Sequence, residues 1–158
     1  MLGYVRSHMK IISINIRGLG GGYKLKYLKG LLRKEEVDMI CIQETKIQVL
    51  KQSNCYNMWG HNNVEWVSKQ AMGNSGGILT MWHKKKFKCV KQIVRDRYIG
   101  VIGHVYSSNN VNPIPVAIFN VYSSCEFNEK ISLWEELVNI KMGEECKQWC
   151  VLGDFNVR

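Results

Sequence analysis

The sequence contains no long uninterrupted apolar segment. None of its apolar runs approaches the roughly 18 residues of a membrane-spanning helix, and no segment has the composition of a secretory signal. We therefore predict a chain without a membrane span. The opening residues 1–8 precede a second methionine, Met9, and are interpreted as a ragged leader before a domain that covers residues 9–158.

Repeats, low-complexity segments and linkers are also absent. Without a linker to divide them, 158 residues with 46% hydrophobic content predict one folded domain with a core of its own.

Paired metal-binding histidines are missing as well, because His8, His61, His83 and His104 are scattered along the chain. The spacing of Cys146 and Cys150 is therefore a weak indication of zinc. The six cysteines occur without a secretory signal, so reduced thiols are expected rather than a disulfide framework.

Acidic residues are few relative to basic ones. The chain has 22 Lys and Arg against 13 Asp and Glu, a net charge of +9. This balance favours a polyanionic partner such as nucleic acid, through counterion release and electrostatic steering. Charge alone is equally compatible with a soluble basic protein that binds no nucleic acid.

Hydrophobic periodicity predicts an α/β fold. Two amphipathic helices are expected over residues 23–36 and 131–143. A turn is expected at Gly73–Gly77. Strand-length apolar runs lie at residues 10–18, 37–45, 78–83, 84–94, 97–108, 115–124 and 148–156. Strands in hairpin succession, with helices before and after, predict a mixed-sheet α/β sandwich whose helices cover its outer faces.

Polar residues occupy the ends of four of these strands: Asn15, Glu44, Tyr122, and Asp154 with Asn156. Strand ends gathered on one rim can form a site. A glutamate carboxylate suits Mg²⁺, which takes one or two protein carboxylates and keeps most of its waters. An aspartate can position or deprotonate water, and a tyrosine hydroxyl can stabilise charge on a phosphate oxygen. Singly, each residue is better explained as a turn or core residue; together they predict metal-assisted phosphoryl chemistry.

The same segments resemble the endonuclease/exonuclease/phosphatase superfamily, with the deoxyribonuclease I-like fold, and within it the endonuclease domain of plant LINE-type retrotransposons. The resemblance covers Met9 to Arg158. The segments that carry it are NIRGLG (Asn15–Gly20), IQETK (Ile42–Lys46), SGGILTMW (Ser75–Trp82), FNVYSS (Phe119–Ser124) and LGDFN (Leu152–Asn156).

The resemblance implies a role for each residue. Glu44 is implied as the metal-binding glutamate and Asn15 as a supporting ligand. Tyr122 is implied to contact phosphate, and Asp154 with Asn156 to align the attacking water. The implied metal ligands are thus Asn15, Glu44, Asp154 and Asn156, with Mg²⁺ as cofactor and Mn²⁺ as the alternative.

The sequence departs from the family pattern in three respects. Arg17 stands where apurinic endonucleases carry an acid, so abasic-site specificity is not expected, and Ser124 stands where proline is common. The late Ser-Asp-His motif of the family is missing. We therefore expect a C-terminally truncated, incomplete domain with weak or no activity.

The function implied is metal-dependent phosphodiester hydrolysis, as a DNA-nicking endonuclease of a retroelement whose parent would also encode a reverse transcriptase. DNA is the expected partner, no obligate protein partner is inferred, and the expected location is intracellular, in the nucleus. Basic residues at positions 24–34 and 84–88 are candidates for backbone contacts. The alternatives are a phosphatase acting on inositol phosphates or lipids, and a non-catalytic nucleic-acid-binding module.

Overall fold

The structure is a computed structural model that describes residues 8–106 and 112–157. The predicted leader, apart from His8, and the end of the strand expected over residues 97–108 lie outside the described residues. The strands are β1 (Ile11–Asn15), β2 (Met39–Gln43), β3 (Val64–Met72), β4 (Ser75–His83), β5 (Phe87–Val94), β6 (Tyr98–Val105), β7 (Ile114–Tyr122) and β8 (Trp149–Asp154). The helices are α1 (Gly22–Lys34), α2 (Gln52–Trp59) and α3 (Phe127–Gly143).

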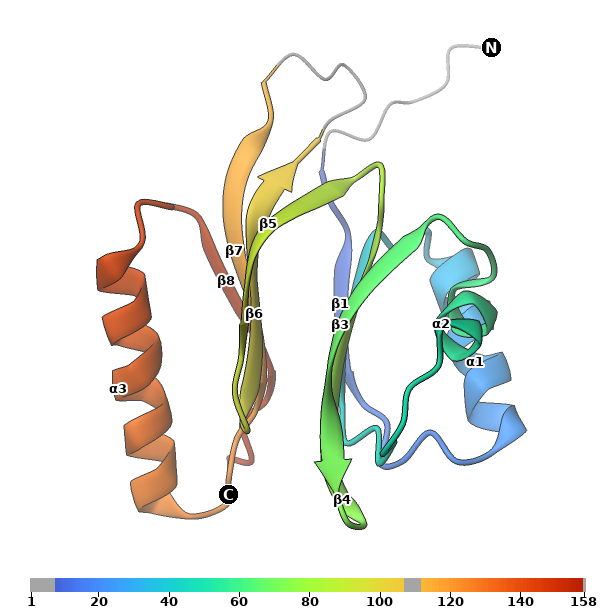
Figure 1. Cartoon of the computed structure of the whole chain (residues 1–158), viewed down its shortest axis with the longest axis horizontal. Coiled ribbons are helices and arrows are strands. Elements are labelled where there is room, and N and C mark those ends of the chain that lie inside the picture. Colours follow the sequence, from blue (N-terminus) through green and yellow to red (C-terminus); the bar gives the residue numbers. More distant parts are fainter. Residues whose placement is uncertain (1–7, 107–111, 158) are drawn as a thin grey trace.

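The strands form two four-stranded sheets rather than one. The first has the order β1-β2-β4-β3 and the second the order β5-β6-β7-β8. Each contains one parallel pair, β1 with β2 and β7 with β8, and its other pairs are antiparallel. The sheets pack face to face, with α1 and α2 outside the first and α3 outside the second (Figure 1). The predicted α/β sandwich with helices on its outer faces is confirmed.

Period-two alternation along the central strands separates the core layers. On β2, Met39 and Cys41 face the layer between the sheets, whereas Ile40 and Ile42 face the helices α1 and α2. All five residues of β2 are buried, as expected for a strand covered on both faces. A third cluster lies beneath α3, where Leu133 and Leu137 pack on β7.

The structure differs from the expectation mainly over residues 52–72. This stretch contains α2 and β3, whereas the sequence showed only irregular apolar spacing there. The buried residues of α2 are Cys55, Met58 and Trp59. They span little more than one helical turn, so the helix is too short to show a clear period in the sequence. The predicted turn at 73–77 is also shorter, because β4 begins at Ser75. Its glycines Gly76 and Gly77 belong to the strand and accept hydrogen bonds from Lys46 and Thr45.

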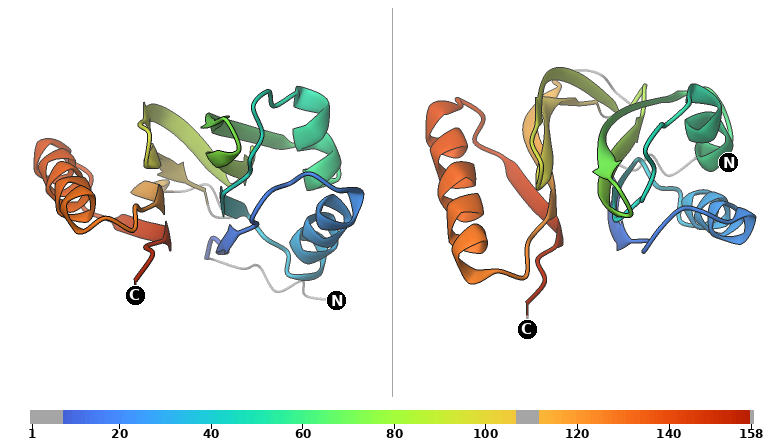
Figure 2. Two further views of the ribbon diagram at one scale, coloured as in Figure 1. Left: turned by 90° about the horizontal axis from the view of Figure 1, so that it is seen from below. Right: turned by 60° about the horizontal axis from the view of Figure 1, so that its bottom comes forward.

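Two parallel strand pairs bring four carboxyl-terminal strand ends to one end of the molecule. Asn15 of β1 pairs with Gln43 of β2, and Tyr122 of β7 pairs with Asp154 of β8. Figure 2 turns this end toward the viewer, with the C-terminus on it. The last residues of strands from both sheets therefore form a shared rim. No described helix is long and apolar enough to cross a membrane.

Candidate active site

A hydrogen bond between the two sheets joins Glu44 to Tyr122. Glu44 follows β2 in the first sheet, and Tyr122 ends β7 in the second. The Tyr122 hydroxyl donates to Glu44 Oε1 at 2.6 Å. Two residues that are 78 positions apart in the chain thus meet at the rim.

A second inter-sheet contact joins Asn15 to Asp154. Asn15 Nδ2 donates to Asp154 Oδ2 at 2.6 Å, and the backbone N–H of Asn156 donates to Asp154 Oδ1 at 3.0 Å. Asn15 is itself held, because its Oδ1 accepts the backbone N–H of Arg17 at 3.0 Å. Both oxygens of the Asp154 carboxylate are therefore oriented by neighbouring donors.

The side chain of Asn156 faces the backbone of the second sheet. Its Nδ2 donates to the backbone carbonyl of Ser123 at 2.6 Å. The backbone carbonyl of Asn156 accepts from Lys130 Nζ at 2.6 Å. In this arrangement Asn156 holds the β8 tip against the start of α3, and it reaches Asp154 through its backbone N–H. The structure thus links all five predicted site residues through hydrogen bonds in two inter-sheet groups.

The backbone around the site is unusual. Glu44 has φ +54° and Asn156 has φ +46°, a left-handed conformation that non-glycine residues seldom adopt. The Glu44 conformation is held by backbone bonds on both sides: its carbonyl accepts from Gly18 at 2.6 Å, and the next residue, Thr45, donates to Gly77 at 3.1 Å. Such strain persists where the surroundings over-determine the conformation, which is frequent at functional sites.

The surroundings of Tyr122 also raise the pKa of its hydroxyl. Burial, the hydrogen bond to Glu44, and the negative charges of Glu44 and Asp154 raise the pKa of Tyr122 to about 12. The phenol is therefore protonated at neutral pH and remains a hydrogen-bond donor.

The donor set fits a hard divalent cation. The carboxylates of Glu44 and Asp154 supply oxygen ligands, and Mg²⁺ commonly needs only one or two carboxylates besides water and substrate oxygens. Asn15 directs its Nδ2 at Asp154 and its Oδ1 at the backbone N–H of Arg17, so it orients a carboxylate ligand in this arrangement. The part of the chain that the structure describes contains no group of three or more His, Cys, Asp and Glu side chains that could hold a metal ion. A magnesium site does not require such a group, since water and phosphate oxygens complete its coordination.

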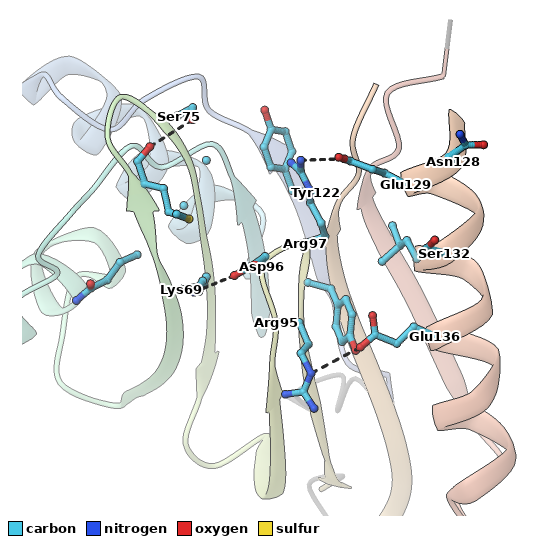
Figure 3. A pocket seen from close by; sticks show the side chains of 16 residues that line it. Lys69, Ser75, Arg95, Asp96, Arg97, Tyr122, Asn128, Glu129, Ser132 and Glu136 are labelled. Carbon is cyan, nitrogen blue, oxygen red and sulfur yellow. Dashed lines mark hydrogen bonds and ion pairs between the residues drawn. The ribbon is translucent and has the colours of Figure 1, made fainter. Parts of the chain in front are cut away.

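A groove of about 710 Å³ opens beside Tyr122. It lies between the β3–β4 hairpin, the turn from Arg95 to Arg97, and α3 (Figure 3). Three ion pairs tie that turn to its neighbours: Asp96 to Lys69 at 3.1 Å, Arg97 to Glu129 at 3.1 Å, and Arg95 to Glu136 at 3.6 Å. The walls therefore offer cationic side chains that a polyanion could recruit from their carboxylate partners.

Arg97 was not singled out in the sequence. Its backbone carbonyl accepts the N–H of Tyr122 at 2.8 Å, so its position is fixed relative to the site. The available signal was the charged tripeptide Arg95–Arg97 between two strand-length apolar runs. Only the pairing of β6 with β7 brings it beside Tyr122.

Of the two basic segments expected to hold DNA, one lies near the rim and the other lies away from it. Lys24 of α1 donates to the carbonyls of Ile16, Arg17 and Gly18, close to the rim, so it braces the loop after β1. The run at positions 84–88 follows His83, at the opposite end of β4 from Ser75, and therefore lies away from the site.

Residues 12–158 match the Endonuclease/Exonuclease/phosphatase family. The chain belongs to this family. Its members are hydrolases that generally depend on divalent metal ions, and they include nucleases and phosphatases. No curated protein matches the chain.

Solved structures share the fold. A mannosyl-6-phosphatase from Bacteroides thetaiotaomicron has a TM-score of 0.68 at 14% identity, over 95% of this chain and 66% of that one. An AP endonuclease from Leishmania major has a TM-score of 0.68 at 16% identity, over 94% and 55%. The catalytic domain of Xenopus laevis APE2 has a TM-score of 0.66 at 15% identity, over 94% and 59%. The chain thus spans less than two thirds of the length of these proteins.

Proposed function

We propose that this chain provides the metal-binding part of a DNA-nicking endonuclease that hydrolyses phosphodiester bonds with Mg²⁺. The observation that carries the proposal is the pair of inter-sheet hydrogen bonds at the rim, Glu44 with Tyr122 and Asn15 with Asp154, where Tyr122 and Asp154 end neighbouring paired strands. Family membership supports hydrolysis. The resemblance to retroelement endonucleases supports the DNA target and a nuclear location.

Each residue has a task in this proposal. Glu44 and Asp154 would hold the cation, with Asn15 supporting Asp154; the cation when bound supplies Lewis-acid stabilisation of a phosphate oxygen. Tyr122 donates a hydrogen bond to the phosphate as its charge grows. Asp154, oriented by Asn15 and Asn156, accepts a proton from the attacking water.

The described residues place no histidine at the rim. His8 precedes β1, His83 ends β4 and His104 lies near the end of β6, in each case at the other end of a strand whose opposite end borders the site. His61 packs against His83, with ring centroids 5.8 Å apart. The described residues thus offer Asp154 as a base but no histidine to assist it, and because general acid–base assistance contributes about 10²- to 10⁴-fold, we expect slow turnover, with metal and DNA binding as the stronger signals.

A DNA substrate is supported by the charge of +9 and by the groove beside Tyr122, whose arginines can exchange carboxylates for phosphates. A phosphatase is the second candidate, because the mannosyl-6-phosphatase has the same TM-score as the AP endonuclease. A third, a basic module without chemistry, predicts DNA binding that is indifferent to Glu44.

The test combines metal titration with nicking of supercoiled plasmid. We expect Mg²⁺ binding and Mg²⁺-dependent nicking that fall at least about 100-fold in Glu44→Gln and Asp154→Asn. The exposed acid Glu135 on α3 offers a matched control, and Glu135→Gln should behave as the unmodified chain. Metal binding that is unchanged in both site variants would contradict the proposal, and hydrolysis of a phosphomonoester in preference to plasmid would favour the phosphatase.

A further inference from the structure

A pair of buried amides crosses the otherwise apolar layer between the sheets. Gln43, the last residue of β2, is 1% exposed, and Asn120 of β7 is fully buried. Gln43 Nε2 donates to Asn120 Oδ1 at 2.7 Å. Just beyond this pair the layer changes from apolar side chains to the carboxylates of the rim.

Each amide is further held by the first sheet. Gln43 Nε2 also donates to Ser13 Oγ of β1 at 3.0 Å. Asn120 Nδ2 donates to Thr80 Oγ1 and to the carbonyl of Leu79, both at 3.1 Å on β4. Asn120 thus fixes β7 against two strands of the opposite sheet, and this network leaves no described buried side-chain polar atom without a partner.

The network lies directly beneath the candidate catalytic pair. Gln43 precedes Glu44, and Asn120 lies two residues before Tyr122 on the same face of β7, since both contact the inter-sheet layer. A shift of one sheet along the other would break two hydrogen bonds together, the one between Gln43 and Asn120 and the one between Tyr122 and Glu44. An apolar layer is non-directional and does not by itself fix that shift.

We propose that Gln43 and Asn120 are positioning residues. The hydrogen bond between their side-chain amides fixes the register between the two sheets and so holds Glu44 against Tyr122. The importance of this contact for catalysis rests on the proposed function, whereas its effect on the register of the sheets does not. The simpler explanation is that the amides only stabilise the fold.

Single and double substitutions separate these explanations. Gln43→Met or Asn120→Leu alone leaves the other amide buried without its partner, so the unfolding midpoint should fall. The double substitution removes both amides and should restore much of that midpoint. Positioning predicts that Mn²⁺, used as the probe, binds about 10- to 100-fold more weakly in all three variants.

A second measurement reads the geometry without metal. The ¹³Cζ resonance of labelled Tyr122, assigned with Tyr122→Phe, should move toward that of an exposed tyrosine in all three variants, the double included. Met58→Ala, in the core cluster between α2 and the first sheet, lowers stability away from the rim and should leave both the resonance and the Mn²⁺ affinity unchanged.

The outcomes are distinguishable. If the double variant regains the wild-type resonance and Mn²⁺ affinity along with its stability, the amides only stabilise the fold and the inference is overturned. If wild-type Mn²⁺ binding does not depend on Glu44, the proposed function fails, while the Tyr122 resonance still decides the positioning role.

Discussion

The two ends of the layer between the sheets differ in what their side chains do. Away from the site, Trp82 packs edge-to-face on Phe87 with ring centroids 5.6 Å apart, and both rings are buried. At the rim, Glu44 and Asp154 bring negative charges together and Glu44 adopts a left-handed backbone conformation. One end therefore supplies stability, whereas the other gathers negative charge and a strained backbone conformation, which cost stability.

The largest expected effect lies at the apolar end. Trp82→Ala should lower the free energy of unfolding by about 3–5 kcal/mol, because a buried aromatic side chain leaves a cavity. It also removes the indole donor to Glu65, at 3.2 Å. Chemical denaturation measures the loss. Single substitutions typically lower the free energy of unfolding by about 1 kcal/mol. A decrease smaller than this would show that the apolar end contributes less to stability than its packing indicates.

A smaller loss is expected where β8 approaches β7. Gly153 has φ +147°, and a Cβ there would lie 1.9 Å from the carbonyl oxygen of Val121. Gly153→Ala should cost about 3 kcal/mol through overpacking and backbone strain and should displace Asp154. Gly20→Ala is the matched control, since a Cβ at Gly20 meets nothing within 4 Å. Equal denaturation midpoints for the two variants would contradict the expectation.

The smallest effect concerns the rim itself. Glu44→Gln should lower the pKa of Tyr122 from about 12 but not to the ordinary 10.0, because burial is the largest cause of the shift and remains. The folded-state pKa is raised, so the contribution of the neutral phenol to stability is complete below pH 10 and is lost as the pH rises through about 12. Tyrosinate absorbance measures the pKa of Tyr122 in the unmodified chain and in Glu44→Gln, and Tyr122→Phe assigns the transition. An unchanged titration would remove Glu44 as a cause.

The sequence predicted the helices α1 and α3, most strands and the polar strand ends, because periodicity and polarity are local properties. The start of α3 at Phe127, four residues before the prediction, was missed since its first turn is mostly polar. The α/β sandwich was predicted correctly, but the order of the strands within each sheet has no local signal, because pairing partners are set by tertiary packing. The positive φ of Glu44 and the contact between Gln43 and Asn120 have no local signal, since each depends on segments distant in the chain.

The division of the site between two sheets has a consequence for how it assembles. Asn15 and Asp154 are 139 residues apart in the chain, and contacts between such distant residues form late because a long loop must close first. During synthesis from the N-terminus, the strand that carries Asn15 emerges long before the one that carries Asp154. The rim that joins Asn15 to Asp154 therefore cannot form until β8 has been synthesised and has paired with β7.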